Sequence, residues 1–314
     1  MRPRVLQNSR IALPAIEAEL FDAFDVHPLW KDADPASFLQ AHGRQFTGMV
    51  TGSLKGADAG LIDALPSLQV ICNYGVGYDR IDLAAAKRRG VAVSNTPDVL
   101  TDCVADLAFG LLIDVARGIT AADRFVRRGG WQPGAAFPLT RKVSGKRLGI
   151  LGLGRIGRAI AERSAGFAMD VRYHSRTPAP GARWAYEGSL TALAEWADFL
   201  VVACAGGPST HHLVTADVLA ALGPEGFLIN ISRGTVVDEA ALVQALVDER
   251  LGGAALDVFE REPAVPAALL PLDRVVLAPH MASGTQETRQ AMGRLMLDNL
   301  RSWYAHGKLL TPVQ

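Results

Sequence analysis

The sequence predicts an α/β protein in which helices cover parallel sheets, and three observations lead to this fold class. Short runs rich in β-branched residues alternate with longer helical runs from residue 48 to residue 278. Residues 146–174 contain a strand, a glycine-rich turn, a helix and a second strand, which together form a β-α-β unit. The chain has 314 residues, about twice a typical domain of about 150. We therefore expect two domains.

The first third of the chain carries the alternation clearly from residue 48 onward. Strands are expected at residues 48–51, 68–73 and 91–95, and helices at residues 59–65 and 82–89. The first of these helices ends before Pro66. The second has Asp82 in its first turn and Gly90 after its last, as helix termini favour. Residues 1–40 are assigned to this domain by position alone.

Residues 101–117 form a long, mostly apolar helix in this prediction. It is either a core helix or a helix shared with a second subunit. Residues 124–142 read as an irregular arm that carries Trp131, an aromatic side chain that would be costly to expose on a monomer. These two segments predict a homodimer.

The second half of the chain carries six predicted strands with helices between them. The first two are residues 146–151 and 170–174, separated by a turn at 152–157 and a helix that begins at Arg158. Four more buried strands follow, at residues 198–203, 226–231, 252–257 and 274–278. Six strands in this pattern make a complete dinucleotide-binding domain with a doubly wound parallel sheet.

Composition and charge exclude several classes of partner. Lys plus Arg and Asp plus Glu number 32 each, so the net charge is zero and there is no long-range field to attract nucleic acid. No apolar run approaches the roughly 18 residues of a membrane span. Cys72, Cys103 and Cys204 are widely spaced and odd in number, which predicts core thiols in the reducing cytoplasm. No set of metal ligands is predicted.

The glycine-rich turn predicts a dinucleotide site. Gly152 permits the tight turn, Gly154 lets the backbone approach a pyrophosphate, and Gly157 allows close packing of helix on sheet. The amides of Arg155 and Ile156, at the start of the helix, then face the anion. The alternative is a tight β-α turn without a ligand.

The end of the second strand of this unit predicts which dinucleotide binds. NAD sites place Asp or Glu there to accept from the ribose 2′-hydroxyl, whereas Asp170 stands at the opposite end of the strand. Ser175 and Arg176 follow the strand instead and offer donors to a 2′-phosphate. We therefore expect NADP(H), with NAD(H) possible. Alternatively, Arg176 is only a solvated loop cation.

Three residues that follow successive strands predict the chemistry. Arg233, Glu262 and His280 come after the predicted strands at 226–231, 252–257 and 274–278, and ligands of such sheets bind beyond these carboxyl ends. Reduction of a 2-keto acid needs a cation for the carboxylate, an imidazole that gives a proton, and an acid that orients the imidazole. Each residue alone also fits a structural role, but the set favours catalysis.

These residues lie in motifs that resemble the D-isomer-specific 2-hydroxyacid dehydrogenases, in particular the glyoxylate and hydroxypyruvate reductase branch. The resemblance extends from about residue 45 to the end of the sequence. The matching segments are the Gly152 turn, Asn73-Tyr74-Gly75-Val76-Gly77-Tyr78-Asp79, Ile231-Ser232-Arg233-Gly234, Ala255-Leu256-Asp257-Val258-Phe259 with Glu262-Pro263, and Pro279-His280 followed by Ser283-Gly284-Thr285.

The resemblance implies two Rossmann-like domains and a homodimer. The substrate domain would be discontinuous, with residues 1–98 and 286–314, and the cofactor domain would be residues 99–285. Substrate would meet Asn73, Val76 and Gly77, with the Val76 and Gly77 amides on its carboxylate beside Arg233 and His280. Cofactor would also meet Val76, Thr101 and Asp257, the last through the nicotinamide carboxamide, and Ser175 and Arg176 match the members that prefer NADP.

The expected function is NADPH-dependent reduction of glyoxylate and hydroxypyruvate. An aryl pyruvate is the alternative substrate, and a non-catalytic, dinucleotide-sensing, corepressor-like protein is the alternative from another class. Formate dehydrogenase is disfavoured because those relatives carry Gln at the position of Glu262. Two segments depart from the family pattern, namely residues 205–208 and Met281-Ala282, which puts the detailed cofactor contacts there in doubt.

Overall fold

The computed structural model describes residues 2–11 and 13–313. The chain divides into two units, Met1–Leu100 with Ser283–Gln314, and Thr101–Ala282. The first unit is thus discontinuous in sequence. The expected boundaries, between residues 98 and 99 and between 285 and 286, lie a few residues from these divisions. Each unit has its own parallel sheet, so the predicted α/β fold class is confirmed.

The first unit contains a five-stranded parallel sheet in the order β2-β1-β3-β4-β5. Its strands are β1 (Arg4–Gln7), β2 (Asp25–Pro28), β3 (Gly48–Gly52), β4 (Val70–Tyr74) and β5 (Ala92–Ser94). The last three match the predicted strands, whereas β1 and β2 lie in the segment that sequence patterns left unassigned. The strand order 2-1-3-4-5 is that of doubly wound, flavodoxin-like sheets.

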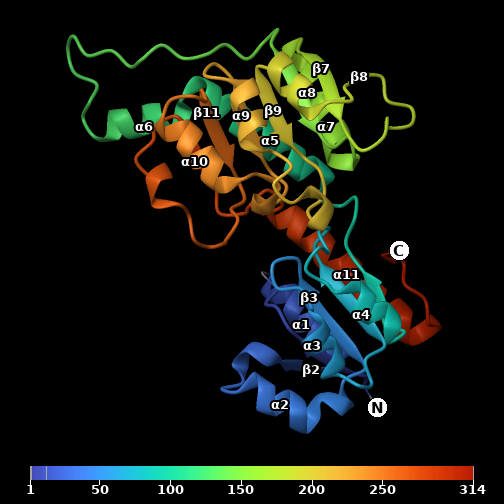
Figure 1. Cartoon of the computed structure of the whole chain (residues 1–314). Coiled ribbons are helices and arrows are strands. Elements are labelled where there is room, and N and C mark those ends of the chain that lie inside the picture. Colours follow the sequence, from blue (N-terminus) through green and yellow to red (C-terminus); the bar gives the residue numbers. More distant parts are fainter. Residues whose placement is uncertain (1, 12, 314) are drawn as a thin grey trace. The chain divides into compact units, whose positions relative to one another are not determined.

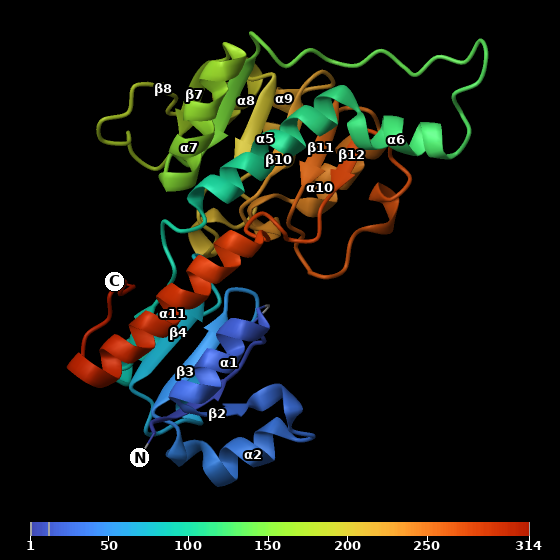
Figure 2. The same ribbon diagram turned by 180° about the vertical axis from the view of Figure 1, so that it is seen from behind.

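Helices cover both faces of this sheet. α1 (Pro14–Ala23) and α11 (Gln286–His306) pack together on one face, where α11 also contacts β4 (Figure 2). α3 (Ala59–Asp63) and α4 (Leu83–Arg88) lie on the other face (Figure 1), and α2 (Pro35–His42) completes the unit. Asp58, Asp82 and Thr285 cap α3, α4 and α11 by accepting backbone N–H groups.

The second unit contains a seven-stranded parallel sheet in the order β12-β11-β10-β9-β6-β7-β8. Its strands are β6 (Arg147–Leu151), β7 (Asp170–His174), β8 (Ala185–Tyr186), β9 (Phe199–Val202), β10 (Phe227–Asn230), β11 (Gly253–Leu256) and β12 (Val275–Leu277). Six of them are the predicted strands, and the two-residue edge strand β8 is an addition. The strand order reverses between β6 and β9, which is where such sheets bind ligands.

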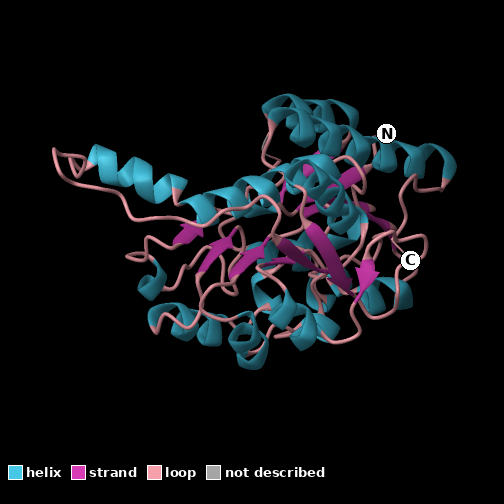
Figure 3. Ribbon diagram, turned by 90° about the horizontal axis from the view of Figure 1, so that it is seen from above, coloured by secondary structure: helices cyan, strands magenta, loops and turns pink. Residues whose placement is uncertain are grey.

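Two helix layers enclose this second sheet, as the view from above shows (Figure 3). α5 (Thr101–Arg117) and α7 (Arg155–Arg163) pack together on one face, and α8 (Leu190–Trp196), α9 (Ala216–Leu222) and α10 (Glu239–Val247) cover the other. α5 packs on β10 and β11 (Figure 2), so it is a core helix of its own unit. α7 begins at Arg155 rather than at the expected Arg158, because the helix starts inside the glycine turn.

The expected irregular arm begins later than predicted. α6 (Ile119–Arg127) continues through residues 124–127, so the prediction is wrong there, and irregular chain follows up to β6. This chain loops out from the rest of the second unit (Figure 1). It exposes 73% of Trp131 and all of Leu139, so these two apolar side chains lie uncovered in the single chain.

Short 3-10 helices complete the described structure, at Leu29–Lys31, Gly43–Gln45, Ser164–Phe167, Pro208–Thr210, Gly234–Val236 and Ala267–Leu269. Among the described residues, none of the helices combines the length and apolar character that crossing a membrane requires. Cys72 is buried, as expected of a core thiol, but Cys103 and Cys204 are only partly buried, and none of the three forms a disulfide.

Candidate active site

The glycine turn between β6 and α7 is shaped by backbone contacts that exclude side chains at two of its three glycines. A Cβ added to Gly152, which has φ +97°, would lie 2.6 Å from backbone atoms of Cys204. A Cβ added to Gly157 would lie 2.1 Å from the carbonyl oxygen of Gly152. At Gly154, by contrast, no atom lies within 4 Å of an added Cβ. The second glycine therefore leaves open space in front of the turn.

That open space lies at the N-terminus of α7, where Gly154 is the N-cap and no side chain caps the helix. The amides of Arg155 and Ile156 belong to the first turn of α7, and first-turn amides have no acceptor within the helix. Together with the helix dipole, they favour an anion. The turn therefore fits the pyrophosphate of a dinucleotide.

The residues after β7 carry donors and no carboxylate. Ser175 Oγ donates to the Thr177 carbonyl oxygen at 2.7 Å, and the Tyr186 hydroxyl donates to the Ser175 carbonyl oxygen at 3.2 Å. These bonds hold the start of the loop, and Arg176 is exposed beside it. The only acid of this strand, Asp170, stands at its first residue. A hydroxyl and a guanidinium thus occupy the position where an NAD site would carry its acid.

Arg233 is held by a tight turn that follows β10. Asn230, the last residue of the strand, donates from Nδ2 to the Arg233 carbonyl oxygen at 3.0 Å and accepts the Ser232 amide on Oδ1 at 3.0 Å. Gly206 lies against the aliphatic part of the Arg233 side chain, because a Cβ at Gly206 would be 2.5 Å from Arg233 Cγ. The absence of a side chain at Gly206 therefore decides where Arg233 lies.

Glu262 and His280 form a hydrogen-bonded ion pair, with 2.8 Å between His280 Nδ1 and Glu262 Oε2. Glu262 Oε1 also accepts the Phe259 amide at 3.1 Å. Burial alone would raise the pKa of the Glu262 carboxyl, but the bond and charge of His280, the Phe259 amide and the charge of Arg233 together hold it below its ordinary value. Glu262 is therefore a carboxylate that accepts hydrogen bonds on both oxygens, from the Phe259 amide and from His280 Nδ1.

The backbone that carries His280 is anchored by Asp257. The His280 amide donates to the Asp257 carbonyl oxygen at 2.8 Å. The fully buried Asp257 carboxylate accepts the amides of Met281 at 2.7 Å and Ala282 at 3.0 Å. Burial raises the pKa of Asp257, and these two amides oppose the rise. His280 itself adopts φ +51°, a left-handed conformation that surrounding bonds must enforce in a non-glycine residue.

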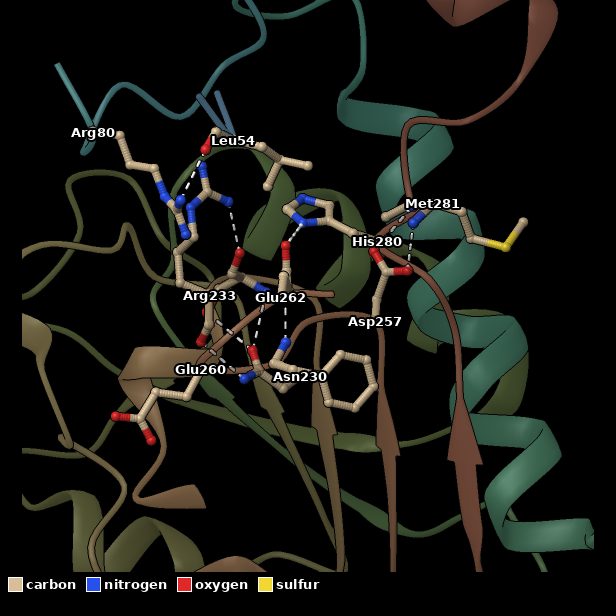
Figure 4. Close-up of polar contacts among 12 residues, drawn as sticks. Leu54, Arg80, Asn230, Arg233, Asp257, Glu260, Glu262, His280 and Met281 are labelled. Atoms are coloured by element: carbon tan, nitrogen blue, oxygen red, sulfur yellow. Dashed lines mark hydrogen bonds and ion pairs between the residues drawn. The ribbon is translucent and has the colours of Figure 1, made fainter. Parts of the chain in front are cut away.

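The structure brings Arg233, Glu262 and His280 together in the second unit. Figure 4 shows them with Asp257 beyond the ends of their strands, and Arg233 lies close enough to lower the pKa of Glu262. Arg233 also donates from Nη1 to the Ser232 carbonyl oxygen at 2.8 Å. A guanidinium, a carboxylate and an imidazole thus meet at one edge of the sheet, because they follow neighbouring parallel strands whose carboxyl ends lie side by side.

The other residues predicted to contact substrate or cofactor lie in other segments of the chain. Thr101 is the first residue of α5 in the second unit and is partly exposed. Asn73 lies in the first unit, where its buried Nδ2 donates to the carbonyl oxygens of Gly75 at 3.0 Å and Gly77 at 2.9 Å. The Val76 carbonyl oxygen accepts from Asn95 Nδ2 at 2.9 Å. Asn73 thus shapes the loop whose Val76 and Gly77 amides are the expected donors to substrate.

Sequence reasoning missed three contributions to this site. Asn230 and Gly206 fix Arg233, and Asp257 fixes the segment after His280. Asn230 could have been found, because it ends a predicted strand at the ligand-binding edge. For Gly206, the sequence offered one indication, because residues 205–208 depart from the family pattern.

This fold and site define an NAD(P)-dependent dehydrogenase, with a glycine turn that fits a dinucleotide and an imidazole paired with a carboxylate in the same unit. Residues 109–282 match the family model of the D-isomer specific 2-hydroxyacid dehydrogenase, NAD binding domain. The chain is 50% identical over 298 residues to a hydroxyphenylpyruvate reductase of Plectranthus scutellarioides, covering 95% of each chain. It is 47% identical to glyoxylate/hydroxypyruvate reductase A of Arabidopsis thaliana, again over 95% of each. The chain belongs to the D-isomer-specific 2-hydroxyacid dehydrogenases, as the sequence motifs predict.

Solved structures agree with this family. An NADPH-dependent glyoxylate/hydroxypyruvate reductase of Sinorhizobium meliloti, in complex with NADP and malonate, superposes with a TM-score of 0.91 at 43% identity, covering 100% of this chain and 97% of that one. A 2-hydroxyacid dehydrogenase of Ketogulonicigenium vulgare gives a TM-score of 0.92 at 46% identity, covering 100% and 99%. The similarity therefore spans both units.

Proposed function

We propose that the protein is an NADPH-dependent reductase of small 2-keto acids, with glyoxylate and hydroxypyruvate as its substrates. The observation that carries this proposal is the contact of 2.8 Å between His280 Nδ1 and Glu262 Oε2, with Arg233 close to the same carboxylate. The family and the named activities of its relatives support the same reaction. They also disfavour a non-catalytic, dinucleotide-sensing role.

Arg233 binds the substrate. A guanidinium forms paired, charge-assisted hydrogen bonds with a carboxylate, and the 2-keto acid presents its carbonyl directly beside that carboxylate. Arg233 therefore both holds the substrate and stabilises the negative charge that develops on the carbonyl oxygen. Asn230 and Gly206 position this guanidinium.

His280 gives the proton. Its Nδ1 is engaged by Glu262, so Nε2 is the nitrogen that donates to the keto oxygen. The ionised Glu262 fixes the orientation of the imidazole ring. Asp257 holds the backbone of the same segment through the Met281 and Ala282 amides, and it would bind the nicotinamide carboxamide of a bound cofactor. When bound, NADPH supplies the hydride that reduces the keto carbon.

The residues around the glycine turn fit the cofactor. Gly154, with the amides of Arg155 and Ile156, holds the pyrophosphate, and Thr101 contributes a further contact. Ser175 and Arg176 bind the 2′-phosphate and give NADPH its preference over NADH. The NADP complex of the Sinorhizobium meliloti relative supports this preference.

An aryl keto acid is the second candidate substrate. The relative that is 50% identical is a hydroxyphenylpyruvate reductase, which favours a wider substrate range. The test is a panel of glyoxylate, hydroxypyruvate and hydroxyphenylpyruvate against NADPH and NADH, compared by kcat/KM. The proposal predicts the highest values for the two small acids with NADPH. If kcat/KM were highest with hydroxyphenylpyruvate, the aryl keto acid would be the substrate in place of the two small acids. If no keto acid were turned over, the proposed function would be refuted.

We also propose that the enzyme works as a homodimer in the cytoplasm. The exposed apolar side chains of α6 and its arm, which include Ile119, Val126, Trp131 and Leu139, form a surface that a second copy would cover. The three cysteines, none of which forms a disulfide, suit a reducing compartment. Sedimentation at micromolar concentration, compared with a Trp131→Ser variant, tests the dimer.

A further inference from the structure

A cluster of potential metal ligands lies in the second unit apart from the reacting groups. His211, His212 and Glu260 each offer one ligand atom, and these atoms all lie within 4.8 Å of one another. We propose that this cluster binds a divalent transition-metal ion, with Zn²⁺ the best match to its donors. Glu260 lies 48 residues after His212 in the sequence, which is why no ligand spacing predicts the site.

The backbone places the two imidazoles side by side. Side chains of consecutive residues in extended chain point to opposite sides, but His212 adopts a left-handed conformation with φ +48°. As a result, the rings of His211 and His212 stack with their centroids 3.9 Å apart. The His212 amide donates to the Thr235 carbonyl oxygen at 2.8 Å, which holds this conformation. Such strain is typical of functional sites.

The distance from His212 to Glu260 is that of two neighbouring ligands. His212 Nε2 and Glu260 Oε1 are 3.5 Å apart, and ligands at about 2.0–2.2 Å from a tetrahedral zinc ion lie roughly 3.3–3.6 Å from each other. Among the described residues, His212 Nε2 has no hydrogen-bond partner although it is shielded from solvent. His211 is exposed, so its ring can move by the small distance that the third bond requires.

The donor set selects the kind of ion. Two imidazoles and one carboxylate occur in three-ligand zinc sites, which leave the fourth position to water or another ligand. Ni²⁺ and Cu²⁺ accept the same donors, whereas Mg²⁺ and Ca²⁺ prefer oxygen alone. The Glu260 carboxylate points away from the His280–Glu262 pair in Figure 4, so the ion would not contact the reacting groups.

The ion would join two loops at the ligand-binding edge of the sheet. The histidines follow β9, Glu260 follows β11, and the Arg233 turn follows the strand between them. Glu260 is itself held by its amide, which donates to Glu239 Oε2 at 3.0 Å. Binding would therefore stabilise the second unit and raise its melting temperature.

Calorimetric titration of Zn²⁺ into the full, tag-free protein, previously treated with chelator and kept reduced, tests the site. We expect one ion per chain, and at least tenfold weaker binding in His211→Ala and in Glu260→Gln. His306→Ala, which removes an exposed histidine of α11 in the other unit, is the matched control and should bind as the parent does. Melting curves with and without Zn²⁺ should show a rise for the parent and the control, and none for the two cluster variants.

Three results would overturn the proposal. Binding weaker than about 1 mM would mean that the cluster holds no ion. Unchanged affinity in either His211→Ala or Glu260→Gln would place the ion at other groups, such as the cysteine thiols. Equal loss in His306→Ala would mean that the zinc binds histidines nonspecifically.

Discussion

Gly206→Ala tests whether the loop after β9 sets the position of the substrate-binding guanidinium. The new Cβ would stand 2.5 Å from Arg233 Cγ and 3.2 Å from Arg233 Cβ, whereas carbon atoms in contact are about 3.5–4.0 Å apart. Arg233 must therefore move by roughly 1–1.5 Å. The crowded atom is close to the Arg233 backbone, so rotation of the distal guanidinium alone does not relieve the contact.

The expected loss follows from the bonds that this movement breaks. Hydrogen bonds to charged groups contribute about 1.5–3 kcal/mol, which corresponds to a roughly 10- to 150-fold fall in kcat/KM. Because Arg233 holds the substrate carboxylate before and during the reaction, most of the loss should be a higher KM for glyoxylate. NADPH affinity, measured by fluorescence titration, should not change.

The assay is NADPH oxidation at varied glyoxylate concentration, with Gly166→Ala as the matched control. Gly166 is an exposed glycine with no atom within 4 Å of an added Cβ, so its variant should match the parent. If Gly206→Ala retained kcat/KM within about twofold, or lost NADPH affinity instead, the positioning of Arg233 by Gly206 would be refuted.

Three further variants test other parts of the site. The pKa of Glu262 lies below its ordinary value of 4.5, so the carboxylate stabilises the fold at neutral pH and this contribution is lost as pH falls through that depressed pKa. Glu262→Gln replaces the carboxylate that pairs with His280 Nδ1, so kcat should fall about tenfold while NADPH affinity stays that of the parent; an unchanged kcat contradicts the role of the pairing. Arg176→Ala should lower kcat/KM for NADPH about tenfold and leave kcat/KM for NADH nearly unchanged. Equal effects on the two cofactors would mean that Arg176 is only a solvated loop cation. Gly157→Ala places a Cβ 2.1 Å from the Gly152 carbonyl oxygen, so the melting temperature and NADPH binding should both fall, and parental values would argue against the tight turn.

Much of the fold follows from the sequence, because buried parallel strands are continuous apolar runs with helices between them. The strands from β3 onward were predicted wherever such a run was long enough. β8 was not, because its two residues are both exposed and carry no burial pattern. α6 was not predicted as a helix, and its residues 124–127 were assigned to the irregular arm because this mixed polar run precedes Gly129 and Gly130.

The catalytic set was predictable for a topological reason, since the carboxyl ends of parallel strands meet at one edge of the sheet. The contacts that position these three residues were not predictable from the sequence. Asp257 accepts amides from residues 24 and 25 positions further along the chain, and Gly206 approaches Arg233 from another loop. Such contacts depend on loop conformation, for which hydrophobic periodicity carries no information. The His211, His212 and Glu260 cluster escaped prediction for the same reason.

The most direct test of the central claim is the single-turnover rate of NADPH oxidation by His280→Ala, with saturating glyoxylate and the parent measured in parallel. If His280 gives the proton, the chemical step should slow by at least about 100-fold, while the affinity for NADPH remains that of the parent. A near-parental rate for the variant would contradict the assignment of His280 as the proton donor and the mechanism built on its pairing with Glu262.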